Sequence, residues 1–168
     1  MNGVLPNQEI EKLIEIGSIT SDVPIDPEQI QPASLDLRLS GKAFRIRASF
    51  LPGSREKVED RLKSLKMHEI DLRDGAVLEK GCVYLVPLLE ELNLSQDIQA
   101  AANAKSSTGR LDLLTRVITN SGEEFDRVSS GYCGNLYAEI CPRSFSVLVR
   151  QGMKPVSYTH LRAHETSI

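Results

Sequence analysis

The feature that most constrains the fold is the succession of short apolar runs, separated by glycine and proline turns, that begins at Ile70. Each apolar run is only a few residues long, as in Cys82–Leu88, Leu111–Ile118 and Asn135–Cys141. Many short strands with this punctuation are typical of a β-barrel or a jelly roll. We therefore expect a mainly β fold from this part of the chain.

The first third of the chain predicts two helices and a hairpin. Residues 5–19 place Ile10, Leu13 and Ile14 on one helical face, and Gly17 suits the helix end. Residues 34–39 and 43–50 alternate like two strands around the turn Ser40-Gly41, which predicts a hairpin. Residues 55–66 are highly charged but keep three apolar residues at helical spacing, which favours a surface helix inserted between strands.

Length, charge and cysteine content narrow the class of protein. The chain has 168 residues, enough for one domain with a core, and a net charge of −3 without a basic stripe, which argues against a nucleic-acid partner. No apolar stretch approaches the roughly 18 residues of a membrane span. The three cysteines lack a Cys-x-x-Cys spacing and predict reduced thiols. A cytoplasmic protein is expected.

Two segments carry chemistry. Residues 105–110, Lys-Ser-Ser-Thr-Gly-Arg, offer two cations, three hydroxyls and a glycine, which suits a polyphosphate. Glu139 is the one acid in the apolar run Gly134–Ile140, which suits proton transfer. Taken singly, a strand glutamate is more often a solvent-facing acid, and a serine-rich loop is more often a turn. Together they favour chemistry on a nucleotide.

We interpret the end of the chain as sequence that does not belong to the native protein. Val156–Thr166 resembles the translation of a transposase-type sequencing adapter. We therefore expect residues 1–154 to be a truncated native lobe and residues 155–168 to be an adapter-derived tail that packs weakly or not at all. His160, His164 and Glu165 lie in this tail, so their metal-like spacing is discounted.

Three segments resemble one family. Gln31–Leu39, Lys105–Leu111 and Gly131–Glu139 are similar to motifs of the dCTP deaminases, members of the trimeric dUTPase superfamily. Order and spacing agree from about residue 5 to Lys154, and the best correspondence is to the N-terminal lobe of the longer, duplicated form. The resemblance implies a dUTPase-like distorted β-barrel or jelly roll with an N-terminal helix and a helical insertion. It also implies a homo-oligomer with a trimer-like assembly of lobes.

The resemblance implies hydrolytic deamination of dCTP to dUTP and ammonia, a step in pyrimidine deoxynucleotide synthesis. In the catalytic group, Glu139 would shuttle the proton, Ser106 would position the water, and Arg110 would orient Glu139. Lys105 and Ser107 would face the triphosphate, and Asp126 the deoxyribose. The full set implied to bind substrate is Lys105, Ser107, Thr108, Gly109, Asp126, Tyr137 and Ala138.

A metal-free reaction is expected. Zinc deaminases use a His-x-Glu…Pro-Cys-x-x-Cys signature, whereas Cys141-Pro142 is followed by no second thiol. Mg²⁺ would arrive on the nucleotide triphosphate rather than in a protein cage.

Departures from the family pattern leave alternatives open. Lys105 stands where the family has arginine and so lacks the bidentate fork. Residues 117–124 do not match, and Ser129-Ser130 are extra. A dUTPase or a bifunctional deaminase–dUTPase, with Asp126 activating water, is a second interpretation, although the expected Gly-Arg-Ser-Gly loop is absent. A non-catalytic lobe that binds nucleotide or supplies an interface is a third.

Overall fold

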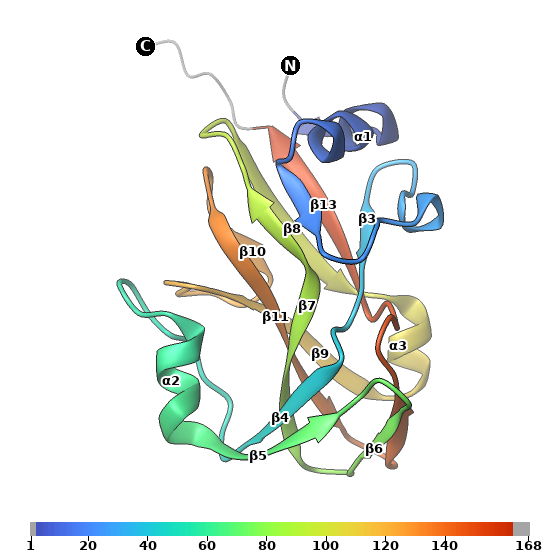
Figure 1. Ribbon diagram of the computed structural model, residues 1–168, viewed down its shortest axis with the longest axis vertical. Helices are drawn as coiled ribbons and strands as arrows, with labels where there is room; N and C mark the ends of the chain where they lie inside the picture. Colours follow the sequence, from blue (N-terminus) through green and yellow to red (C-terminus); the bar gives the residue numbers. More distant parts are fainter. Residues whose placement is uncertain (1–2, 163–168) are drawn as a thin grey trace.

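The computed structural model describes residues 3–162, and its core lies between two antiparallel β-sheets (Figure 1). Side chains from both sheets meet in this core, Ala100 and Tyr158 from one and Val86 and Ala138 from the other. The first sheet contains, in hydrogen-bonded order, β1 (Gly3–Val4), β13 (Val156–Arg162), β8 (Ile98–Ala104) and β10 (Arg127–Val128), with β3 (Leu35–Leu37) also paired to β13.

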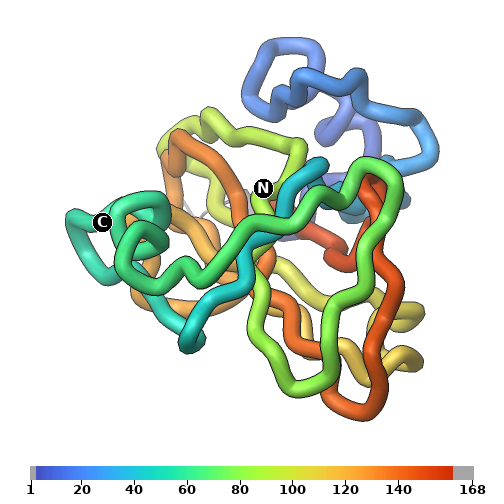
Figure 2. The backbone as a smooth tube through the Cα atoms, turned by 60° about the horizontal axis from the view of Figure 1, so that its bottom comes forward, coloured from blue at the N-terminus to red at the C-terminus, as the bar shows by residue number. Residues whose placement is uncertain are grey.

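The second sheet holds the longest strands and carries the predicted acid. In hydrogen-bonded order it contains β5 (Lys66–Asp71), β4 (Lys42–Ile46), β7 (Val83–Asn93), β11 (Cys133–Pro142) and β9 (Leu113–Thr119), with β2 (Ile19–Ser21) also paired to β7. A separate pair, β6 (Ala76–Leu78) and β12 (Val147–Val149), lies at one end, where the chain near residue 80 runs beside the chain near residue 145 (Figure 2). These sheets confirm the expected mainly β fold.

Both expected helices are present, but the first is shorter than expected. α1 spans Asn7–Glu15 and buries Ile10 and Leu13, whereas Ile16 is 74% exposed. Gly17 follows with φ +81°, a conformation that glycine adopts without strain, and this ends the helix. α2 spans Val58–Leu65, and a 3₁₀ turn, η1, spans Pro27–Gln29.

The hairpin expected from residues 34–50 is wrong. β3 pairs with β13, and β4 pairs with β5 and β7, so the two strands belong to different sheets. The chain crosses between the sheets at Ser40-Gly41 instead of reversing there. Alternation identifies a strand but not its partner, because both sheets offer the same apolar core face.

The expectation that residues 155–168 pack weakly is wrong for the part that the structure describes. β13 lies between β8 on one side and β1 and β3 on the other. Val156, Tyr158 and His160 all point into the protein and are at most 1% exposed. The sequence pattern missed this strand because a histidine occupies one of its core-facing positions. Residues 163–168 lie outside the described residues.

Candidate functional site

Glu139 lies near the middle of β11, directly opposite Leu85 of β7 and Arg116 of β9. Successive strand residues point to opposite faces, so Ala138 and Ile140 enter the main core while Glu139 points away from it. The carboxylate faces the side covered by α2 and is only 2% exposed. That side carries a second apolar cluster, formed by Ile46, Phe50, Val58, Leu62, Leu85, Ile118 and Tyr137.

Arg116 holds the carboxylate of Glu139. Its Nε and Nη2 atoms both donate to Oε2, at 2.9 and 2.6 Å. Nη2 also donates to the Ser49 hydroxyl at 3.1 Å, and the guanidinium carbon lies 3.9 Å from the ring centroid of Phe125. The other carboxylate oxygen, Oε1, is buried and has no hydrogen-bond partner among the described residues.

Within this chain it is Arg116, not Arg110, that contacts the Glu139 carboxylate. The orienting role expected for Arg110 stays a prediction. Arg110 ends the short helix α3, Ser106–Arg110, and its side chain is exposed. No hydrogen bond or ion pair joins it to another residue in the described part of the chain. Arg116 was missed because an arginine within an apolar strand run carries no motif. Its pairing depends on the β9–β11 register.

The serine-rich turn offers some of its predicted groups to solvent and buries others. Ser106, Ser107 and Gly109 are exposed in α3. Thr108, in contrast, is 5% exposed, and its hydroxyl donates to the backbone carbonyl of Pro155 at 3.0 Å. Thr108 therefore anchors the turn to the chain before β13, and its assignment to the substrate-binding set stays a prediction.

Lys105, just before α3, is tied to the strand β3. Its ammonium donates to the carboxylate of Asp36 at 2.7 Å, and Asp36 is 3% exposed. The backbone carbonyl of Asp36 accepts a hydrogen bond from the side-chain Nε2 of Gln29. The same nitrogen also donates to the carboxylate of Glu90. Through Asp36, Gln29 and Glu90, the serine-rich turn is thus connected to buried polar groups in the interior.

A buried ion pair anchors that polar network. Arg38 Nε lies 2.8 Å from Glu90 Oε1, and the Arg38 backbone amide donates to the other oxygen of Glu90. The remaining guanidinium nitrogens donate to Ser21 and to the carbonyls of Val23 and Pro24. The donors of a buried guanidinium need partners, and this surrounding set gives at least one to each of its nitrogens. Asp36 and Arg38, two polar residues of the predicted strand 34–39, are thus buried, a feature that alternation alone did not reveal.

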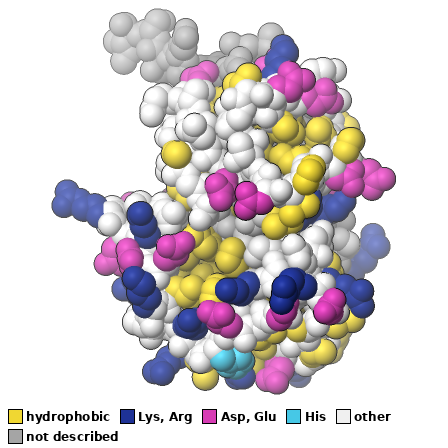
Figure 3. All heavy atoms as spheres, viewed as in Figure 1, with side chains coloured by type: hydrophobic (Ala, Val, Ile, Leu, Met, Phe, Trp, Pro, Cys, Tyr) yellow, Lys and Arg dark blue, Asp and Glu magenta, His cyan; other side chains and the backbone are white. Residues whose placement is uncertain are grey.

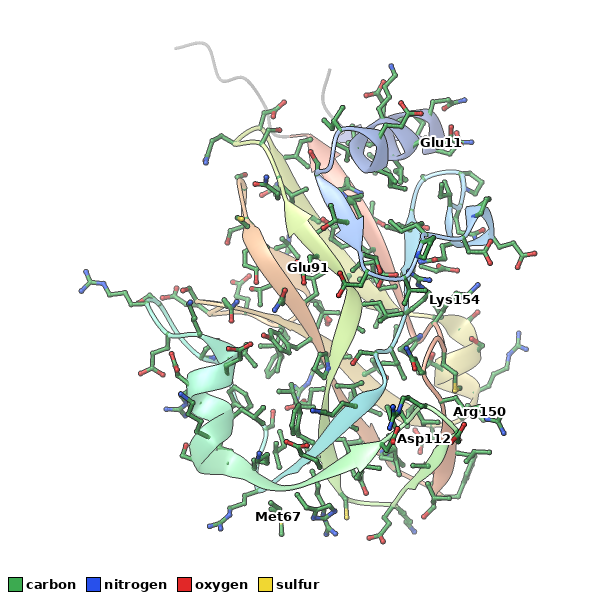
Figure 4. All side chains as sticks on the ribbon, viewed as in Figure 1. Glu11, Met67, Glu91, Asp112, Arg150 and Lys154 are labelled. Atoms are coloured by element: carbon green, nitrogen blue, oxygen red, sulfur yellow. The ribbon has the colours of Figure 1, made fainter. Side chains whose placement is uncertain are left out.

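The serine-rich turn and Glu139 do not meet within one chain. A cavity of about 310 Å³ beside α3 is lined by Lys105, Ser107 and mostly apolar residues, including Ile140. Ile140 is the strand neighbour of Glu139 and points to the opposite face, so the acid is outside this cavity. Figure 1 and Figure 2 show α2 and α3 on opposite sides of the molecule, and Lys154, labelled in Figure 4, lies on the α3 side.

Asp126 and its neighbours lie at the junction of β8, β9 and β10. Asp126 has φ +62°, and its carboxylate accepts from the Val117 amide at 2.8 Å. Burial raises the pKa of Asp126, while that hydrogen bond and the charge of Arg116 oppose the rise. Tyr137 is 3% exposed, and Ala138 is fully buried in the main core. The Ala138 side chain therefore packs in the core, and the assignment of Ala138 to the substrate-binding set stays a prediction.

The described part of the chain shows no cluster of three or more His, Cys, Asp or Glu residues arranged to hold a metal. None of its helices is both long and apolar enough to cross a membrane. Cys82, Cys133 and Cys141 are free thiols. On the face seen in Figure 3, basic and acidic side chains are interspersed over the half that contains α2 and β5.

These features define a mainly β domain with a buried acid–arginine pair on one face and an exposed serine-rich turn on the other. Residues 1–165 match the family described as the 2′-deoxycytidine 5′-triphosphate deaminase (DCD) N-terminal domain. The chain belongs to this family. The match confirms the resemblance inferred from the three motifs.

Individual relatives agree with the family assignment. The chain is 35% identical over 112 residues to "dCTP deaminase, dUMP-forming" of Tropheryma whipplei (strain Twist), which covers 67% of this chain and 56% of that protein. It is 29% identical over 152 residues to the protein of the same name from Beutenbergia cavernae, covering 90% and 75%.

A solved structure extends the likeness to nearly the whole chain. The crystal structure of 2′-deoxycytidine 5′-triphosphate deaminase from Agrobacterium tumefaciens superimposes with a TM-score of 0.94 at 50% identity, over 97% of this chain and 49% of that one. The chain thus spans about half the length of that protein and of the first curated relative. The dUTPase-like fold expected from the sequence is confirmed.

Proposed function

We propose that the protein to which this lobe belongs is a dCTP deaminase that converts dCTP and water to dUTP and ammonia. The observation that carries the proposal is the 50% identity to a dCTP deaminase over 97% of the chain. The enzyme would act in pyrimidine deoxynucleotide synthesis. It would do so in the cytoplasm, a compartment that the free thiols support.

The proposed chemistry uses Glu139 and no zinc. Water adds to C4 of cytosine while the Glu139 carboxylate accepts a proton from that water and delivers it to N3. In the resulting adduct, Glu139 then carries the proton of the C4 hydroxyl to the amino group, the C4–N bond breaks, and ammonia leaves as the uracil carbonyl forms. The burial of Glu139 supports this role, because a water-poor site strengthens proton transfer between fixed groups.

The proposed site is shared between lobes. Ser106 and Arg110 are exposed on the α3 side, whereas Glu139 points to the opposite face. A substrate could contact both groups only if α3 of one lobe faces the Glu139 side of another. Lys105 and Ser107 would then meet the triphosphate and the Mg²⁺ that it carries, with Ser106 and Arg110 near the base. An oligomer of lobes follows, and the 168-residue chain alone would be inactive.

Two other functions are favoured by specific observations. Curated relatives are named dUMP-forming, which favours a bifunctional enzyme that also removes pyrophosphate from dUTP. In that case Asp126, which keeps a half-buried carboxylate, would activate the water. The departure of residues 117–124 from the family pattern favours instead a lobe that only completes a site whose acid comes from elsewhere.

The test is product analysis with the full-length protein and dCTP. Ammonia release with dUTP as the nucleotide product supports the deaminase. Ammonia together with pyrophosphate and dUMP supports the bifunctional enzyme. If ammonia release is present but insensitive to Glu139→Gln, the acid is supplied outside this lobe, and absence of ammonia release contradicts the proposal.

A further inference from the structure

The two oxygens of the Glu139 carboxylate are in different environments. Oε2 accepts two hydrogen bonds from Arg116, whereas Oε1 is buried without a partner among the described residues. A carboxylate oxygen offers about two lone-pair directions, so both directions at Oε2 are used. Buried polar atoms without partners are rare in folded proteins and call for an explanation. At Oε1, no described residue occupies either lone pair, so this oxygen can accept a proton.

Arg116 is itself fixed in place by other parts of the chain. Its Nη2 donates to the Ser49 hydroxyl, which lies beyond the end of β4. Its guanidinium lies 3.9 Å from the centroid of the Phe125 ring, a favourable cation–π distance. These two contacts, from separate segments, restrict the arginine and through it the rotamer of Glu139.

We infer that Arg116 is a positioning residue that occupies Oε2 of Glu139 and leaves Oε1 as the oxygen that exchanges protons. This inference rests on the proton shuttle proposed for Glu139. Arg116 acts through Glu139 and needs no contact with the substrate. The cross-strand register places the two residues directly opposite each other, so the pair forms within one lobe before any assembly of lobes.

The test uses three variants of the full-length protein. Arg116→Gln removes the charge and should lower kcat for dCTP deamination about 100-fold, with KM changed less than about threefold. Arg116→Lys keeps the charge but not the two-nitrogen contact, and should recover part of the loss, to about 10-fold below the parent. Ser49→Ala keeps the arginine, loosens it, and should lower kcat by a smaller factor. If Arg116→Gln does not fold, Ser49→Ala still tests whether fixing Arg116 matters for kcat.

Arg45→Gln is the matched control. Arg45 is also a strand arginine, its side chain is 29% exposed against 31% for Arg116, and it pairs with Glu79 at 3.6 Å. This variant should retain the parent kcat. A loss of kcat as large as that of Arg116→Gln would show that removing any such arginine is harmful, and would overturn the inference.

The Glu139→Gln variant separates the inference from the proposed function. If it keeps normal turnover, the proton shuttle itself fails. If it is inactive while all three test variants turn over at the parent rate, the shuttle stands and the positioning role is overturned. In the Glu139→Gln background, Arg116→Gln should cause no further loss of kcat, since its effect passes through the carboxylate.

Discussion

The Lys105 ammonium lies 2.7 Å from the carboxylate of Asp36, an almost completely buried residue of strand β3. The Lys105 side chain remains 30% exposed, so it can hold Asp36 with one proton and still offer others to a ligand. Asp36 is in turn held by Gln29. The position of the lysine is therefore determined by the interior of the lobe.

Replacing Asp36 by Asn should release Lys105 without changing the side-chain shape. We expect KM for dCTP to rise by roughly 10-fold, because the free lysine must be ordered on each binding event, with kcat changed less than about twofold. Steady-state kinetics of the full-length enzyme measure both constants. Asp71→Asn, which removes an exposed acid paired with Arg73, is the control. An unchanged or lower KM in Asp36→Asn would contradict the prediction.

Lys105 and Arg110 should be separable by kinetics. Lys105→Ala removes a group proposed to contact phosphate and should mainly raise KM, by about 10-fold or more. Arg110→Ala removes a group proposed to lie near the base and carboxylate, and should mainly lower kcat. Initial-rate measurements over a range of dCTP concentrations distinguish the two effects. The same kinetic change in both variants would argue against separate roles.

Glu139→Gln keeps the size of the side chain and much of its hydrogen bonding but removes the base. Deamination by the full-length enzyme should fall at least about 100-fold, while binding of dCTP, measured by calorimetry, stays within a few-fold of the parent. The corresponding change at Glu91, an exposed acid on the neighbouring strand β7, should leave turnover unchanged. Near-normal deamination by Glu139→Gln would remove the acid from the mechanism.

His160 should make the 168-residue chain acid-sensitive. Burial lowers the pKa of His160 from 6.5 to about 3, because the interior disfavours the charged ring. The unfolded chain takes up the proton near pH 6.5 and the folded chain does not, so the free energy of unfolding falls as pH drops from 6.5 toward 3. The loss between pH 7 and pH 5 is roughly 2 kcal/mol.

Chemical denaturation at several pH values tests this effect in His160→Leu. The variant should lose the histidine contribution to acid sensitivity and gain stability at neutral pH, because the parent ring buries two nitrogens without partners among the described residues. His68→Leu, on the exposed part of β5, is the control. An unchanged pH dependence in His160→Leu would contradict the prediction.

The unpartnered buried atoms of β13 are also evidence on the origin of residues 155–168. The Tyr158 hydroxyl and both His160 nitrogens are buried without partners in the described part of the chain, a pattern that an inherited core strand rarely shows. We propose that residues 155–168 are adapter-derived and that Val156–Arg162, which form β13, occupy a strand position that the fold provides. Sequencing the source gene beyond codon 154 decides this proposal, and a natural gene that encodes Val156–Thr166 would contradict it.

The sequence by itself determined the local structure and the family. The helices at 7–15 and 58–65 and the strands around Glu139 follow from periodicity and turn residues, which act between near neighbours. The three motifs then identified the dCTP deaminase relationship. Tertiary structure decided which side chains meet: Asp36 with Lys105, 69 positions apart, and Glu139 with Arg116 rather than Arg110. It also decided that a strand containing His160 enters the core. These pairings depend on sheet register and strand order, which many alternating sequences satisfy equally well until the whole chain packs.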